Sequence, residues 1–218
     1  MTKLQKIQQA EYSPYTISLA GTWSFKLDSY PVPLSQVDVD TWGQGTEGEE
    51  GEWDEIQVPG MWQCQFRTKD SPSGEGKKGG KKGERWGKPQ YTNVNYLWPV
   101  DVHGEMARVP SDENETGCYW REFEVPGEWL GKKDEGLERK KKGQHVRLRF
   151  EGVDSAFHLW INGKLVGYSQ GARNPCEFDI LPFLNEEEMK NKIAVRVYQR
   201  CDGSYLEDQV SVHISFSS

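Results

Sequence analysis

The sequence has few cysteines, no long apolar run and no excess of positive charge. Its four cysteines among 218 residues are scattered singly without a CxxC pair, which argues against a zinc site and predicts free thiols. No stretch is long enough to span a membrane, and the N-terminus lacks the apolar core of a signal peptide, so we expect a cytoplasmic protein without a membrane partner. The formal net charge of −7 argues against nucleic acid as a partner. Asn114-Glu115-Thr116 forms a glycosylation sequon, which we expect to stay unmodified in that compartment.

What the sequence does contain is a repeated alternation of apolar and polar residues, which predicts strands with one buried face. Residues 155–161 alternate in this way, and Asn162-Gly163 separates them from a second run at 164–168. Because both turn residues tolerate the positive φ of a type I′ turn, this segment predicts a β-hairpin.

Further alternating runs extend the prediction to an all-β sandwich. They cover residues 22–27, 56–58, 119–125, 145–151 and 192–199. The helical candidate at residues 186–192 is too short to organise a domain.

Three polar segments interrupt the strand pattern. Residues 43–51 are acidic and glycine-rich, residues 71–88 are rich in glycine and lysine, and residues 131–143 are strongly charged. They lack the apolar residues needed to pack, so we interpret them as long polar loop insertions at sandwich edges. A basic arm for nucleic acid at Lys77–Lys82 or Arg139–Lys142 is the alternative. Acidic neighbours and the lack of interleaved aromatic residues argue against it.

Two large side chains on the polar face of residues 155–161 have competing interpretations. Trp160 is either a sugar platform or a side chain packed under a loop or against a neighbouring domain, and we favour the packed arrangement. His158 has no second histidine or carboxylate at ligand spacing. A hydrogen-bonded structural imidazole is therefore favoured over a metal ligand or a base.

Several longer motifs point to a known family. They are Gly21–Phe25, Val58–Gln63 (VPGMWQ), Tyr91–Val94 (YTNV), Asn114–Tyr119 (NETGCY), Phe150–Gly163 and Asp202–Gln209 (DGSYLEDQ). In this order they resemble the N-terminal sugar-binding domain of glycoside hydrolase family 2 β-galactosidases. The resemblance implies a jelly-roll, galactose-binding-like β-sandwich over residues 15–209, preceded by an extension of residues 1–14.

The resemblance also implies two site residues. On its own sequence context, Asp202 beside Gly203 is a turn-stabilising residue. In the family, however, the aspartate of the DGSYLEDQ motif contacts galactose and helps to hold a sodium ion, and the asparagine of the YTNV motif, Asn93 here, touches substrate. Carboxylate oxygen suits a hard cation, and an amide can both donate to and accept from sugar hydroxyls.

No catalytic residue is expected in this chain. Retaining glycosidases use two carboxylates about 5–5.5 Å apart, and in the family these glutamates and the magnesium ligands belong to a TIM barrel that follows an immunoglobulin-like domain. The sequence ends at Ser218. We therefore expect a truncated fragment that is inactive alone, from an enzyme that hydrolyses terminal non-reducing β-D-galactosides. Its implied partners are those domains of the same enzyme, and family members often form homo-oligomers.

Two other functions stay open: a free-standing galactoside-binding module, and a structural or interaction domain without sugar contacts. The divergent tail at residues 210–218 alternates valine, isoleucine and phenylalanine with serine and histidine. This pattern favours a last strand, and the competing interpretation is out-of-frame or intronic sequence.

Overall fold

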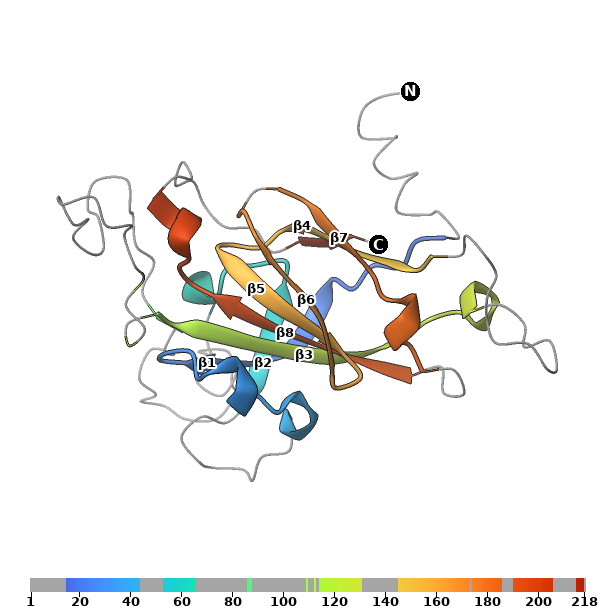
Figure 1. Cartoon of the computed structure of the whole chain (residues 1–218), viewed down its shortest axis with the longest axis horizontal. Coiled ribbons are helices and arrows are strands. Elements are labelled where there is room, and N and C mark those ends of the chain that lie inside the picture. Colours follow the sequence, from blue (N-terminus) through green and yellow to red (C-terminus); the bar gives the residue numbers. More distant parts are fainter. Residues whose placement is uncertain are drawn as a thin grey trace, which may run out of the picture.

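The computed structural model describes residues 15–43, 53–65, 86–87, 109, 112, 114–130, 145–172, 174–185, 190–205 and 215–217. These residues form an all-β sandwich, as the alternation predicts (Figure 1). The described helices are short 3₁₀ turns: η1 (Leu34–Gln36), η2 (Val39–Thr41), η3 (Trp62–Cys64), η5 (Gly127–Leu130), η6 (Leu181–Phe183) and η7 (Asp202–Tyr205). In this part of the chain no helix has the length and apolar character needed to span a bilayer.

The larger sheet has six antiparallel strands in the order β2-β1-β3-β8-β5-β6. Its strands are β1 (Gly21–Asp28), β2 (Asp54–Val58), β3 (Thr116–Glu124), β5 (Ala156–Ile161), β6 (Lys164–Gln170) and β8 (Lys190–Tyr198). The smaller sheet has the order β7-β4-β9, with β4 (Arg147–Gly152), β7 (Cys176–Asp179) and β9 (Ser215–Ser217). Figure 1 shows the smaller sheet on one side of the larger one and the η1–η2 segment on the other.

The main core lies between the two sheets and is rich in aromatic rings. Phe25, Tyr119 and Phe157 from the large sheet and Phe150 from the small sheet are each at most 2% exposed. The ring centroids of Phe150 and Phe157 are 4.5 Å apart, so the two sheets contact directly. Burial of these large apolar side chains supplies the main driving force for the sandwich.

The Asn-Gly hairpin forms as predicted between β5 and β6. Asn162 and Gly163 have φ of 50° and 77°, both in the left-handed region that a type I′ turn requires. Asn162 also fixes the turn to its surroundings, because its side-chain amide donates to Phe183 O at 2.9 Å and its oxygen accepts from Lys192 N at 2.8 Å.

The structure corrects three of the predictions. The helix proposed at residues 186–192 is wrong for Lys190–Lys192, which begin β8 and pair with β3; residues 186–189 lie outside the described residues. Strand β7 was not predicted, because four residues carry too short an alternation to be recognised.

The third correction concerns the segment at residues 71–88, which is not solvated throughout. Trp86 is 6% exposed and packs edge-on against Phe25, with ring centroids 4.9 Å apart. The rest of this segment, apart from Gly87, lies outside the described residues, as do residues 44–51 and 131–143 of the other two.

The expected C-terminal strand is present in part. β9 (Ser215–Ser217) pairs antiparallel with β4 and forms an edge of the small sheet. Residues 206–214, which would connect it to η7, lie outside the described residues.

Candidate functional site

Asp202 lies just beyond the end of β8, at the first position of the η7 turn. The turn is closed by Cys201 N, which donates to Ser204 Oγ at 2.9 Å, and by Ser204 N, which donates to Cys201 O at 2.9 Å. Ser155, only 1% exposed, packs its hydroxyl against both Ser204 Oγ and Cys201 Sγ, at 2.9 and 2.8 Å. The Asp202 side chain itself is exposed. A solvent-facing carboxylate therefore stands on a turn whose base is buried and hydrogen-bonded.

A second clamp holds the chain immediately before this turn. The Asn114 side chain donates to Arg200 O at 3.0 Å and accepts from Arg200 N at 2.9 Å. Asn114 is 5% exposed. Both polar atoms of the sequon asparagine are thus committed inside the protein, which gives a physical reason for the sequon to stay unmodified.

Aromatic rings gather on the outer face of the large sheet, and the charge of Asp202 acts on one of them, Tyr168. His158 lies between Tyr168 and Tyr198, at ring-centroid distances of 4.9 and 5.6 Å, and its Nδ1 is 2.9 Å from the Tyr198 hydroxyl. Burial, followed by the charges of Cys201, Asp202 and Tyr198, raises the pKa of Tyr168 to about 12. Burial, and secondarily the charge of Arg196, lowers the pKa of His158.

His158 is a hydrogen-bonded structural imidazole, as predicted. Trp160 is 5% exposed and packs with Val39 and Ala194 beneath the segment that contains η2, and its ring centroid lies 6.2 Å from that of Trp42. The packed arrangement is confirmed, and Trp160 is not accessible as a sugar platform.

The second predicted site residue, Asn93, lies outside the described residues. The contact with substrate that the resemblance implies for Asn93 stays a prediction. The accessibility of Asp202 agrees with the role implied for it. Tyr168, on which the charge of Asp202 acts, was not predicted as a site residue, although an aromatic residue at a polar-face position of its strand was a signal for it.

A cation site would need more than this one carboxylate. Asp202 offers an oxygen ligand of the kind that hard cations prefer. Among the described residues, however, no group of three or more histidine, cysteine, aspartate or glutamate side chains could hold a metal. Asp202 would thus supply a single carboxylate ligand, and the expected role in holding sodium stays a prediction.

The outer face of the large sheet is organised by one straight row of cross-strand neighbours. In register, Lys26 on β1 pairs with Cys118 on β3, Cys118 pairs with Arg196 on β8, Arg196 with His158 on β5, and His158 with Tyr168 on β6. Directly opposite residues on one sheet face are close neighbours. The row thus brings polar and aromatic groups from distant parts of the sequence onto one surface, with the Tyr168 end nearest Asp202.

Comparisons with known proteins agree with this architecture. Residues 16–216 match the family described as glycosyl hydrolases family 2, sugar binding domain. The chain is 42% identical over 194 residues to a β-galactosidase of Vibrio vulnificus (strain CMCP6), which covers 88% of this chain and 14% of that protein. It is 50% identical over 121 residues to a β-galactosidase of Aeromonas hydrophila, covering 56% of this chain and 10% of that protein.

Among solved structures, that of Bifidobacterium dentium β-glucuronidase complexed with coumarin-3-O-glucuronide is similar over 87% of this chain and 21% of its own, with a TM-score of 0.46 and 19% identity. The chain thus spans only a small part of each relative's length. The match over residues 16–216 nevertheless decides the family: the chain belongs to the sugar-binding domains of glycosyl hydrolases family 2.

Proposed function

We propose that this chain is the sugar-binding domain of a β-galactosidase and supplies part of its galactose subsite through Asp202 and Asn93. The observation that carries the proposal is the placement of Asp202, an exposed carboxylate on a turn fixed by buried hydrogen bonds. A group that is held in place by its supporting shell can meet a ligand without first being ordered.

The chemistry of Asp202 suits both proposed ligands. A carboxylate accepts hydrogen bonds from sugar hydroxyls, and such charge-assisted bonds are stronger than neutral ones. The same oxygens are suitable ligands for sodium. Asn93 would complement Asp202, because an amide can donate to one hydroxyl and accept from its neighbour.

We propose further that the 218 residues do not hydrolyse galactosides on their own. Retention of configuration needs two carboxylates about 5–5.5 Å apart across the sugar, and the resemblance places both of them, with the family's magnesium, in a barrel domain. Purified chain should therefore leave nitrophenyl β-galactoside intact. Turnover that survives purification and disappears when a carboxylate of this chain is replaced would contradict the proposal.

The partners of the domain would be the immunoglobulin-like and barrel domains of the same enzyme, assembled as a homo-oligomer. A chimera tests this relation directly. In it, the aligned part of this chain replaces the matching segment of the Vibrio vulnificus β-galactosidase, to which it is 42% identical. The proposal expects a folded chimera that hydrolyses nitrophenyl β-galactoside and responds to sodium. A chimera that folds and assembles but stays inactive would contradict it.

A free-standing galactoside-binding module is the second candidate, favoured by the exposed ring of Tyr168, 47% accessible, beside Asp202. Calorimetric titration of the isolated chain separates the two functions at this site. A galactose or lactose affinity that is lost in Asp202→Ala would favour the module. If the subsite is completed by other domains, no affinity that depends on Asp202 should be measurable in the isolated chain.

A further inference from the structure

A cavity of about 490 Å³ lies at the opposite end of the cross-strand row from Tyr168, on the outer face of the large sheet. Its floor includes Asp28, Cys118 and Arg196 from three neighbouring strands. Its wall includes Asp38 and Trp42 from the crossing segment, residues 29–43, which contains η1 and η2. The volume falls within the roughly 300–1,000 Å³ of small-molecule sites. Neither Asp202 nor any other residue of its turn lines this cavity.

The wall of the cavity is fastened to the sheet by two cations of β8. Arg196 Nη2 donates to Val32 O at 2.8 Å, while Lys192 Nζ donates to Val39 O at 3.0 Å and Trp42 O at 2.8 Å. Hydrogen bonds from charged donors are the stronger kind. The crossing segment is therefore held at both ends, and the cavity beneath it is a built feature of the fold.

Arg196 is the most informative group in the cavity. It is only 1% exposed, yet its Nη1 has no hydrogen-bond partner among the described residues. Its guanidinium carbon lies 5.3 Å from the centroid of the Tyr198 ring. Buried donors are normally paired, and a donor without a partner calls for an explanation. An acceptor atom of a ligand seated against Arg196 would supply the missing bond.

The charges that line the cavity cancel. Lys26 and Arg196 are balanced by Asp28 and Asp38, and Lys26 Nζ pairs with Asp28 Oδ1 at 3.0 Å. The lining therefore offers hydrogen-bond donors and acceptors without favouring an ion of either sign. This points to a neutral polar ligand rather than to a phosphate or a metal.

The cavity also offers flat apolar surface. The rings of Trp42 and Trp53 both line it, with centroids 5.5 Å apart, and Tyr30, 55% exposed, lies at its edge. A pyranose combines an apolar face of C–H groups with a rim of hydroxyls that both donate and accept. Indole rings match the apolar face, and the Asp38 carboxylate and Arg196 guanidinium match the hydroxyls.

We propose that this cavity binds one neutral pyranose unit of a glycan, independently of Asp202. The domain would then carry two sugar-recognising positions on one sheet face. The second would hold a substrate or polysaccharide near the enzyme without taking part in hydrolysis.

The test is a heteronuclear NMR titration of the full 218-residue chain with galactose, glucose and lactose. The indole N–H signals of Trp42 and Trp53 and the Nε–H signal of Arg196 should shift with saturable, millimolar affinity. Trp53→Leu should weaken this binding by at least about tenfold, which corresponds to about 1.4 kcal/mol. Tyr30→Ala, at an exposed position that the core does not need, should weaken it in the same direction. Asp202→Ala should leave it unchanged.

Three results would overturn the proposal. The first is that none of the three sugars moves the cavity signals in the folded wild-type chain. The second is that inorganic phosphate moves them and the sugars do not, which would make the cavity an anion site. The third is that binding is lost in Asp202→Ala but kept in Trp53→Leu and Tyr30→Ala, which would place the sugar at Asp202. That last result would count against the cavity and, for the proposed function, would favour the free-standing galactoside-binding module that holds its sugar at Asp202.

Discussion

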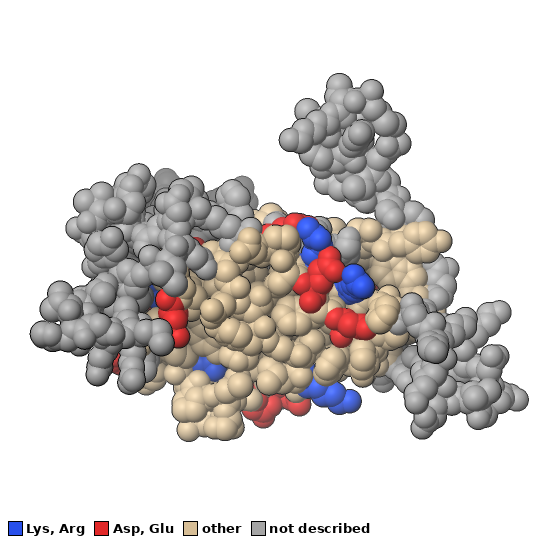
Figure 2. Space-filling view, turned by 45° about the horizontal axis from the view of Figure 1, so that its top comes forward, with Lys and Arg blue, Asp and Glu red and all other residues tan. Residues whose placement is uncertain are grey.

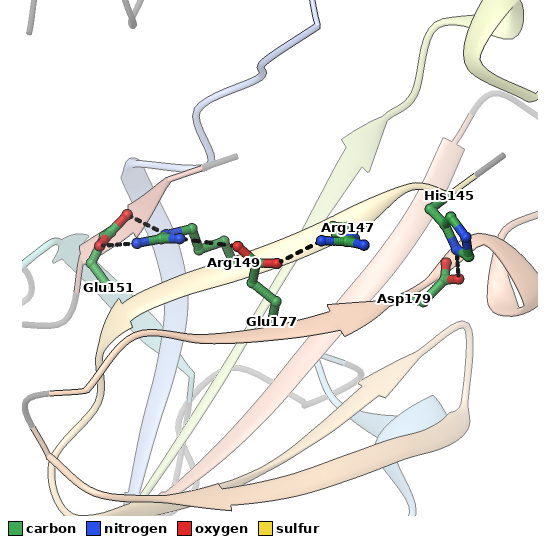
Figure 3. A network of polar contacts seen from close by, with 6 residues as sticks. All are labelled: His145, Arg147, Arg149, Glu151, Glu177 and Asp179. Carbon is green, nitrogen blue, oxygen red and sulfur yellow. Dashed lines mark hydrogen bonds and ion pairs between the residues drawn. The ribbon is translucent and has the colours of Figure 1, made fainter. Parts of the chain in front are cut away.

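The outer faces of the two sheets handle their charged residues in opposite ways. On the small sheet, Arg149 bonds to Glu151 at 2.8 Å and to Glu177 at 3.0 Å, and Arg147 bonds to Glu177 at 3.2 Å (Figure 3). His145 and Asp179 form a further pair at the end of this charge ladder, which comprises His145, Arg147, Arg149, Glu151, Glu177 and Asp179. Figure 2 shows basic and acidic side chains intermingled over this part of the surface.

On the large sheet, Lys26 pairs with Asp28 of its own strand, but the two cations Lys192 and Arg196 of β8 reach away from the strands. Arg196 and Lys192 bond to backbone carbonyls of the crossing segment, and Arg196 Nη1 and Trp120 Nε1 are buried without partners among the described residues. Each arginine of the charge ladder is already matched by carboxylates and faces water. The two outer faces therefore differ in how their charged and polar groups are paired. The described charged groups of the small sheet are paired and solvated, whereas the large sheet keeps buried donors without partners among the described residues.

The largest expected loss of stability comes from Trp160→Ala, on the outer face of the large sheet. Removing this buried ring leaves a cavity beneath Val39 and Trp42, so the free energy of unfolding should fall by about 3–4 kcal/mol. Denaturant unfolding of the purified chain measures it. A loss as small as that of Glu177→Gln in the charge ladder would show that the buried cluster of Val39, Trp160 and Ala194 does not act as a second hydrophobic core.

A smaller loss is expected when the crossing segment is released at Lys192. Lys192→Met keeps the length of the side chain but removes its hydrogen bonds to Val39 O and Trp42 O, which should cost about 1–2 kcal/mol. Burial lowers the pKa of Lys192 although Asp40, Asp38 and Glu122 act to raise it, in keeping with a partly desolvated ammonium. Lys190→Met, at an exposed position of the same strand, is the matched control. Equal losses of stability in the two variants would show that Lys192 does not anchor the crossing segment.

Acidification should weaken the large sheet through His158. Because burial and Arg196 lower the pKa of His158 in the folded protein, the unfolded chain binds the proton first, at about pH 6.5. The contribution of His158 to the free energy of unfolding should therefore be fully present above that pH and should be lost as the pH drops below it. Melting temperatures measured across this range should decline less steeply for His158→Gln than for wild type. Identical slopes would show that His158 does not contribute.

The smallest effect is expected on the small sheet. Glu177→Gln removes the shared partner of Arg147 and Arg149, but these side chains are 37–63% exposed, so the loss should stay below about 1 kcal/mol. Added salt should shrink it further, because it screens exposed charges. Denaturant unfolding at low and high ionic strength measures both. A loss comparable to that of Trp160→Ala would erase the contrast between the faces.

The sequence predicts those parts of the fold that depend on near neighbours. The β5–β6 hairpin follows from alternation and from Asn162-Gly163, whose positive φ values are found as expected. The acidic run before Lys190 suggested a helix, but pairing with β3 overrides local preference for the residues from Lys190 onward. Strand β7 has four residues, too few for their alternation of polar and apolar side chains to be recognised.

The candidate sites, too, could be predicted only where residues close in the sequence form them. Asp202 could be singled out because a glycine-containing turn and a long motif surround it. The cavity could not, because Lys26, Cys118 and Arg196 become neighbours only through the pairing of β1, β3 and β8. An arginine within an apolar strand was the one visible signal, and the register of Arg196 opposite Cys118 and His158 places it on the sheet's outer face.

The kcat/KM of the Vibrio vulnificus chimera for nitrophenyl β-galactoside, with one change on each face, tests the central claim most directly. The account predicts that Asp202→Ala lowers kcat/KM by about tenfold or more, the factor given by a loss of about 1.4 kcal/mol of binding in the transition state. It predicts that Glu177→Gln, in the charge ladder, leaves kcat/KM unchanged. If Asp202→Ala matches the unmodified chimera, or if Glu177→Gln is the variant that loses activity, Asp202 is not part of the sugar site and the assignment of the faces is wrong.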